Sequence, residues 1–231
     1  MATVYANAAD GYVDSGGQSS HANARGASSG TAGGTSATSA SEAVRYFKTS
    51  GRGGTTYFVR RVFLWFDTSG ITGTLSGATL KVYPVTNACD IIAVKSDAFG
   101  GDGSASLADA DFNNVDFSTA YSAEIPSGDL GAGAYRDIAL NSTALADMKN
   151  NNVIIISLMT YHEDYSNTEP GADVNTRFGM HFRDFGGISR DPYIDYTLST
   201  GYGHRVNGVS SASISKINGV ATASISKVNG I

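Results

Sequence analysis

The chain has 231 residues, of which 16% are charged, and its formal net charge is -5. This low and negative charge excludes the basic field that attracts nucleic acid, so we expect no nucleic-acid partner. The sequence contains no run of about 18 apolar residues, so we expect no membrane span and no membrane partner. The N-terminus lacks the basic and apolar regions of a secretory signal, so we expect a chain that is made as a soluble intracellular protein.

The N-terminal third begins with an expected strand at Thr3–Val13. Residues 14–41 are mostly Gly, Ser, Ala and Thr, which predicts a long, exposed loop or arm. Because loops of this length are uncommon in compact domains, we expect the segment to be mobile or to be ordered by packing on a neighbouring molecule. Strand character returns at Ala43–Lys48 and Tyr57–Asp67, with a turn at Gly51–Gly54.

The stretch Arg60–Tyr83 predicts a strand, a turn and a second strand. The first strand carries large apolar side chains on both faces, as in a strand that is covered on each side. The second strand places Ala78, Leu80 and Val82 on one face and polar or amphipathic side chains on the other, which predicts one buried face.

The remaining elements follow the same pattern of short strands and polar connections. A helix of about two turns is expected at Ser142–Lys149, because Asn141 or Ser142 can cap its first amides and Leu145 and Met148 share one face. The further strands are expected at Ile91–Val94, Arg136–Leu140, Val153–Met159, Arg177–Phe185 and Tyr193–Leu198. About eight to ten strands and one short helix predict an all-β fold, a jelly-roll-like antiparallel β-sandwich.

The irregular segment Asp97–Asn114 contains four aspartates, Asp97, Asp102, Asp109 and Asp111. Carboxylates suit Ca²⁺, but their spacing lacks the alternate-residue order of an EF-hand loop that ends in Glu. Turn formation explains these residues better, so we expect no metal site here.

Catalytic motifs are missing from the sequence. The four histidines, His21, His162, His181 and His204, lie in unrelated contexts, and none pairs with a second histidine at metal-ligand spacing. The single cysteine, Cys89, is expected in the core. We therefore expect no enzyme activity, no catalytic residues, no cofactor and no bound metal.

Beyond Leu198 the composition changes to an 11-residue repeat, with copies at 206–216 and 217–227 and a third that stops at Ile231. Each copy contains Asn-Gly and several hydroxyl residues, which favours turns and short strands, although the period also fits a helical face. Two copies cannot bury their own apolar side chains, so we expect the tail (200–231) to be an assembly element separate from the sandwich (1–199), with a frayed terminus as the alternative. The expected interface residues are Val206, Val209, Ile214, Ile217, Val220, Ile225, Val228 and Ile231.

Three segments carry a resemblance to a known family. Residues 61–83 resemble the signature of DNRLRE-type domains through Arg-x-Phe-Leu-x-Phe-Asp, Thr-Ser-Gly-Ile and Ser-Gly-Ala-Thr-Leu-Lys-Val-Tyr. Ala8–Val13 and Arg190–Tyr196 are similar to the opening and closing strands of that family. The resemblance implies a β-sandwich related to some carbohydrate-binding modules and found in secreted proteins and phage virion proteins. The tail resembles the Asn-Gly-Val repeats that end many phage structural proteins.

These features predict a virion structural protein on the particle surface, specifically a capsid decoration or cement protein. It is expected to be made in a host cytoplasm, and its expected partners are the major capsid protein or other virion proteins and copies of itself, in a homo-oligomer such as a trimer. The alternative is a carbohydrate-binding adhesion module on a tail fibre, which requires an exposed aromatic platform for a glycan. A polysaccharide-active enzyme would need paired carboxylates at a cleft. Trp65 is expected to pack in the sheet rather than to stack on a sugar.

Overall fold

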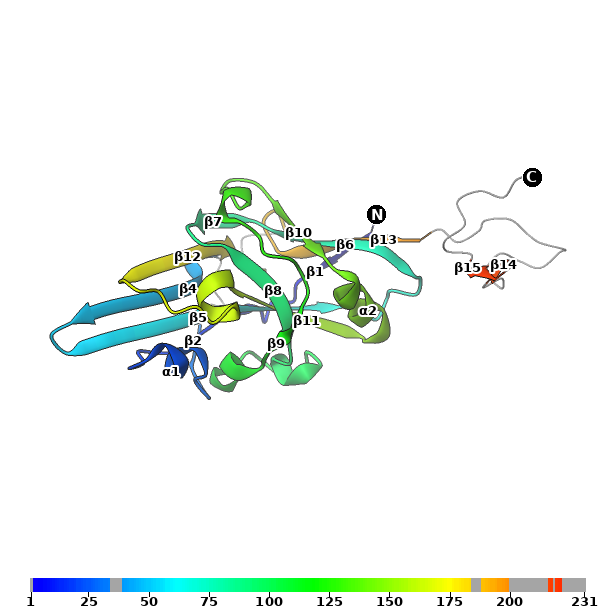
Figure 1. Cartoon of the computed structure of the whole chain (residues 1–231). Helices are drawn as coiled ribbons and strands as arrows, with labels where there is room; N and C mark the ends of the chain where they lie inside the picture. Colours follow the sequence, from blue (N-terminus) through cyan, green and yellow to red (C-terminus); the bar gives the residue numbers. More distant parts are fainter. Residues whose placement is uncertain (1, 34–38, 184–187, 200–215, 218, 222–231) are drawn as a thin grey trace.

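The computed structural model describes residues 2–33, 39–183, 188–199, 216–217 and 219–221. Two antiparallel sheets face each other in a β-sandwich (Figure 1). The smaller sheet has the strand order β1 (Ala2–Tyr5), β13 (Tyr193–Leu198), β6 (Leu75–Val82) and β10 (Arg136–Leu140). The expected all-β sandwich is therefore confirmed.

The larger sheet has nine strands. Its main path is β7 (Pro84–Asn87), β12 (Val174–His181), β4 (Ser39–Gly51), β5 (Gly54–Asp67), β11 (Val153–Thr160), β8 (Ile91–Ser96) and β9 (Val115–Ala120). Strand β2 (Gly11–Asp14) pairs with β5 and with β3 (Thr31–Gly33). The described sheets thus hold more strands than the sequence predicts, because several of them have only three to six residues.

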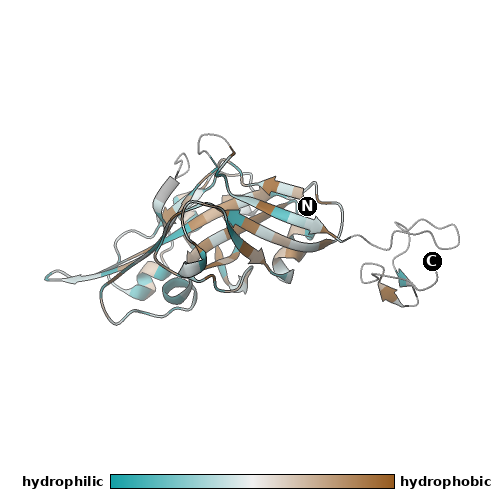
Figure 2. Ribbon diagram, turned by 90° about the horizontal axis from the view of Figure 1, so that it is seen from above, coloured by the Kyte–Doolittle hydropathy of each residue, from teal (hydrophilic) through white to brown (hydrophobic). Residues whose placement is uncertain are grey.

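The main hydrophobic core lies between the sheets. Strand β5 contributes Val62, Leu64 and Phe66, and β6 contributes Leu80 and Val82, all fully buried. In Figure 2 the strands change between brown and pale residues along their length, as expected for a sheet with a buried and an exposed face. Burial of these side chains supplies the main driving force for packing one sheet on the other.

A second core covers the opposite face of β5, so the prediction of a strand buried on both sides is confirmed. Phe63 and Val59 of β5 pack there with Tyr46 of β4 and with Phe99 and Phe112. The covering elements are α1 (His21–Arg25) and the 3₁₀ turns η1 (Phe99–Gly101) and η2 (Asp109–Asn113). Strands β5 and β6 belong to different sheets, so the turn between them is a crossing between layers and not a hairpin.

The expected single strand at Thr3–Val13 is wrong. Strand β1 joins the small sheet and β2 joins the large one. The break lies at Asn7, whose side chain accepts a hydrogen bond from the Ala9 amide while its carbonyl accepts one from Asp10. An Asn side chain that bonds to the backbone two residues on forms a turn, which lets the chain change sheets.

The interpretation of 14–41 as an exposed loop or intermolecular arm is also wrong for its described part. Helix α1 is capped by Ser20, whose side chain accepts from the Asn23 amide, and His21 and Ala24 are buried. Small residues make this packing possible: a Cβ on Gly30 would lie 2.4 Å from the Asp14 carbonyl oxygen. The described residues 14–33 therefore pack on their own domain.

The other elements are close to expectation. Helix α2 (Ser142–Asn150) is capped by Asn141 and buries Met148, so the structure has this predicted helix in addition to α1. Cys89 is buried in the main core as predicted. A 3₁₀ turn, η3 (Ser127–Asp129), and a π-helix, η4 (Tyr161–Tyr165), complete the sandwich. Within the described ranges, no helix is long and apolar enough to cross a bilayer.

Candidate functional site

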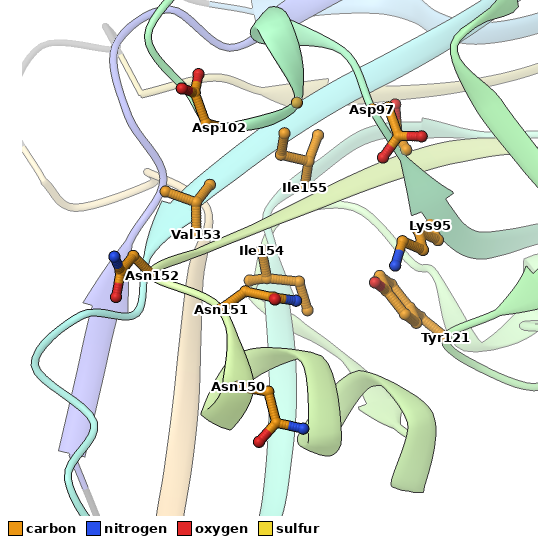
Figure 3. Close-up of a pocket in the computed structure, with 12 residues that line it drawn as sticks. Lys95, Asp97, Asp102, Tyr121, Asn150, Asn151, Asn152, Val153, Ile154 and Ile155 are labelled. Atoms are coloured by element: carbon orange, nitrogen blue, oxygen red, sulfur yellow. The ribbon is translucent and has the colours of Figure 1, made fainter.

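A polar pocket of about 670 Å³ opens where β8, the loop after it and the start of β11 meet the end of α2 (Figure 3). Asp97 and Asp102 come from the loop that follows β8, and Ile155 lies between them in the view. Three consecutive asparagines continue the wall: Asn150 is the last residue of α2, and Asn151 and Asn152 follow it. The pocket therefore offers carboxylate and amide groups that are exposed to solvent.

One wall of this pocket is held by a hydrogen-bond network. Asp147 Oδ2 of α2 accepts from the Tyr121 hydroxyl at 2.5 Å and from Lys95 Nζ at 3.1 Å. Burial, together with the hydrogen bond to Asp147, raises the pKa of Tyr121 far above its usual range. The phenol therefore keeps its proton and donates a hydrogen bond to Asp147, so Tyr121 is not set up as a catalytic base.

The groups that line the pocket can form hydrogen bonds with a polar, hydroxylated ligand. Asp97, Asp102 and the asparagines can accept from or donate to hydroxyl groups. Tyr121 is only 1% exposed, so its ring offers no stacking face to a sugar. Recognition of sugars by stacking would have to occur elsewhere on the molecule.

An aromatic row crosses the outer face of the small sheet. Tyr5 of β1 stands opposite Tyr193 of β13, and Tyr193 stands opposite Lys81 of β6, which is paired in turn with Asp137 of β10. The rings of Tyr5 and Tyr193 lie 5.4 Å apart, and Lys81 Nζ donates to Asp137 Oδ1 at 2.6 Å. The row thus places two aromatic rings and an ion pair side by side on one sheet face.

Two further tyrosines extend this row at the ends of the strands. The Tyr135 ring lies 4.9 Å from Tyr193 and 5.4 Å from Tyr83. The Tyr135 hydroxyl donates to the Asp191 carbonyl, and burial raises its pKa well above the usual range. We call Tyr5, Tyr83, Tyr135 and Tyr193 the tyrosine row. Tyr5 is its exposed member, at 36%.

The tyrosine row was not predicted, because its members come from four separate segments and meet only through strand pairing. The sole local signal is that Tyr5 and Tyr83 each lie at a strand end, a position shared by many tyrosines. The pocket is likewise formed by segments distant in sequence. Neither feature follows from the spacing of residues along the chain.

The predicted assembly residues fall mostly outside the described residues. Val206, Val209, Ile214, Ile225, Val228 and Ile231 lie there, so their placement is not tested. Ile217 and Val220 pair with each other between β14 (Lys216–Ile217) and β15 (Val220–Ala221), on either side of an Asn-Gly sequence. Gly219 adopts φ +82°, and Val220 is 51% exposed. The described residues of the repeat, 216–217 and 219–221, thus form two short paired strands.

The aspartates of the 97–114 segment support turns, as predicted. Asp102 accepts from the Ser104 amide, and Asp111 accepts from the Ala108 amide and from the Asn114 side chain. Asp109 accepts from the Ala32 amide and so links this segment to β3. The hydrogen bonds to Ser104 hold the pKa of Asp102 below its usual value. Trp65 packs on the second core as expected, and its ring lies so close to Gly103 that a Cβ added there would be only 3.0 Å from it.

Comparison with models of known protein families finds no match, and comparison with curated proteins finds no relative. The resemblance to DNRLRE-type domains and to phage repeat tails therefore stays a prediction from the sequence.

Proposed function

We propose that this chain is a virion structural protein that decorates a capsid by contacts with coat protein and with copies of itself. The terminal repeat carries the proposal. Its described hairpin has two residues in each strand, too few for a hairpin to be stable in water by itself. It also leaves Val220 half exposed. Burial of such apolar side chains against a partner is the simplest way for the repeat to gain stability.

The sandwich is suited to act as a rigid carrier for this tail. Both of its cores include side chains of β5, one core on each face of the strand. The residues described in the pocket and the tyrosine row carry polar and aromatic groups and include no activated nucleophile. Many identical copies on a shell would each add a modest interface, whose apolar burial is worth about 25 cal/mol per Å² before ordering costs are subtracted.

Mass spectrometry of purified particles tests the proposal directly. Hundreds of copies of this chain per particle, relative to the major coat protein, are expected for a decoration protein. A few to some tens of copies would indicate a tail component and contradict decoration. Absence from particles would contradict any virion role.

Variants of the tail test the observation that carries the proposal. A chain ending at Ser199 should keep the circular dichroism of a folded sandwich and lose particle binding. Val220→Asp should weaken particle binding in the full chain, whereas Ala221→Ser, a matched change at an adjacent exposed position, should leave it unchanged. Normal occupancy by the truncated chain would show that the tail is not the assembly element.

Glycan binding is the second candidate, and the tyrosine row favours it. Aromatic faces next to carboxylate and ammonium groups suit the alternating apolar and hydroxyl surfaces of a sugar. Tyr5→Ala should then abolish glycan binding on an array, while Asp97→Ala in the pocket should leave it intact. The reverse result would transfer glycan binding to the pocket, and no binding by the wild-type chain would exclude this function.

A further inference from the structure

A cluster of three ligand-type side chains lies outside the pocket, the tyrosine row and the tail. Asp90 precedes β8, Glu124 precedes an isolated bridge at Ile125, and His162 belongs to the π-helix η4. One potential ligand atom from each residue lies within 4.8 Å of the other two. His162 Nε2 is 3.1 Å from Asp90 Oδ2 and 3.5 Å from Glu124 Oε1.

Backbone hydrogen bonds bring these three residues together. Ile91 and Ile125 exchange both of their backbone hydrogen bonds, at 3.0 and 2.8 Å, in an antiparallel bridge, so that Asp90 and Glu124 lie diagonally across it. The Tyr161 amide donates to the Asp90 carbonyl at 2.9 Å, which places His162 next to both. The cluster is therefore fixed by the main chain of three segments and not only by attraction between its side chains.

Asp90 is also oriented from outside the cluster. Its Oδ1 accepts from the Ser127 amide at 2.7 Å, so that Oδ2 faces His162. A carboxylate that is held through one oxygen and presents the other is the usual arrangement of a metal ligand. His162 lies in a π-helix, a rare form that is often retained at functional sites.

The distances fit a small divalent ion. Ligands at about 2.0–2.1 Å from a tetrahedral ion lie about 3.3–3.4 Å from one another, close to the two separations from His162 Nε2. Two carboxylates balance the charge of such an ion, and the imidazole nitrogen favours zinc or another transition metal over calcium. The side chains of His162, Asp90 and Glu124 are 57%, 27% and 35% exposed, so an ion can enter and water can complete its shell.

We infer that Asp90, Glu124 and His162 form a binding site for a divalent transition metal such as Zn²⁺. The inference departs from the sequence-based expectation of no bound metal and does not depend on the proposed virion function. The ion would join the start of β8, the segment before Ile125 and the π-helix. The competing explanation is that His162 only pairs with the two carboxylates and that the three residues bind no metal.

Calorimetric titration of the full chain with Zn²⁺ alone tests this inference. One ion per chain is expected, with affinity reduced about tenfold or more by Glu124→Gln and by His162→Gln. Asp137→Asn is the matched control, because Asp137 is an exposed carboxylate that is paired with a cation on the small sheet. The control should bind Zn²⁺ like the wild type.

A second readout places the ion at the imidazole. Zn²⁺ should shift the nuclear magnetic resonance signals of the His162 ring in wild type, and reaching the same shift in Glu124→Gln should require about tenfold more Zn²⁺. Equal Zn²⁺ affinity in wild type and in both cluster variants would overturn the site. A wild-type chain that binds no Zn²⁺, or that binds Ca²⁺ more tightly, would also overturn it.

Discussion

Arg61 and Asp164 form a bidentate ion pair that is shielded from solvent, with Nε and Nη2 of the guanidinium each 2.7 Å from a carboxylate oxygen. The two side chains are 0% and 1% exposed. Arg61 also donates to the carbonyls of Phe112 and Arg25. The pair thus connects β5 to η4, η2 and the end of α1.

Removal of one partner from this pair should destabilise the fold strongly. Asp164→Asn leaves a buried guanidinium without its counter-charge, and we expect a loss of about 3–5 kcal/mol in the free energy of unfolding. Asp137→Asn, in the exposed pair with Lys81, should cost under about 1 kcal/mol. Urea unfolding of both variants measures the difference, and equal losses would contradict the structural role given to Arg61.

Alkaline pH should reduce stability partly through Tyr121. Burial and the hydrogen bond to Asp147 raise its pKa in the folded state, so the folded chain holds the phenol proton more tightly than the unfolded chain. The resulting stability is fully present below the pKa of tyrosine in the unfolded chain, about 10. It is lost as the pH rises above that pKa, by up to about 1.4 kcal/mol per pH unit. The free energy of unfolding, measured in urea at several pH values from neutral to alkaline, should fall less steeply with pH for Tyr121→Phe than for the wild type. An identical fall in both proteins would refute this contribution.

Cys89 should be unreactive in the folded chain. Burial raises the pKa of its thiol, and the charges of Glu163 and Asp90 act in the same direction. Since the thiolate is the nucleophile, labelling by a disulfide reagent should be slow at neutral pH and should become fast in guanidinium chloride. A native chain that is labelled at the unfolded rate would show that Cys89 is accessible.

Gly30 should tolerate no side chain. A Cβ at this position would lie 2.4 Å from the Asp14 carbonyl oxygen and 2.8 Å from Val13 Cγ1, so Gly30→Ala must displace β3 from β2. We expect a loss of about 1–3 kcal/mol in the free energy of unfolding. Gly128→Ala is the matched control, because a Cβ there meets no heavy atom within 4 Å. Unchanged thermal midpoints for both variants would argue against close packing of 14–33.

Local patterns predicted much of this fold. Strands β5 and β6 follow from alternation within a few residues, and the Asn141 cap of α2 follows from one side chain and two neighbouring amides. The packing of α1 could not be predicted in this way. Its buried residues are His21 and Ala24, and neither a lone histidine nor an alanine stands out in a Gly- and Ser-rich segment.

The candidate sites were predictable to a smaller extent. The tyrosine row depends on the register between β1 and β13, the first and last strands of the sandwich, so it joins residues that are very distant in sequence. The metal cluster depends on a bridge at Ile125 and on a π-helix, and neither has a recognisable local pattern. Only the repeat tail could be recognised from the sequence, because a repeat is a pattern of neighbouring residues. Most of its residues lie outside the described ranges.

Strand β5 is buried on both faces, so the two cores share one strand and depend on each other. Val62 and Phe63 are adjacent in the chain, yet one supports the sandwich and the other supports the layer under α1. Loss of either layer would expose one face of the same strand to water. The sandwich and its covering layer should therefore melt in a single cooperative transition, and the segment 14–33 belongs to the folding unit itself.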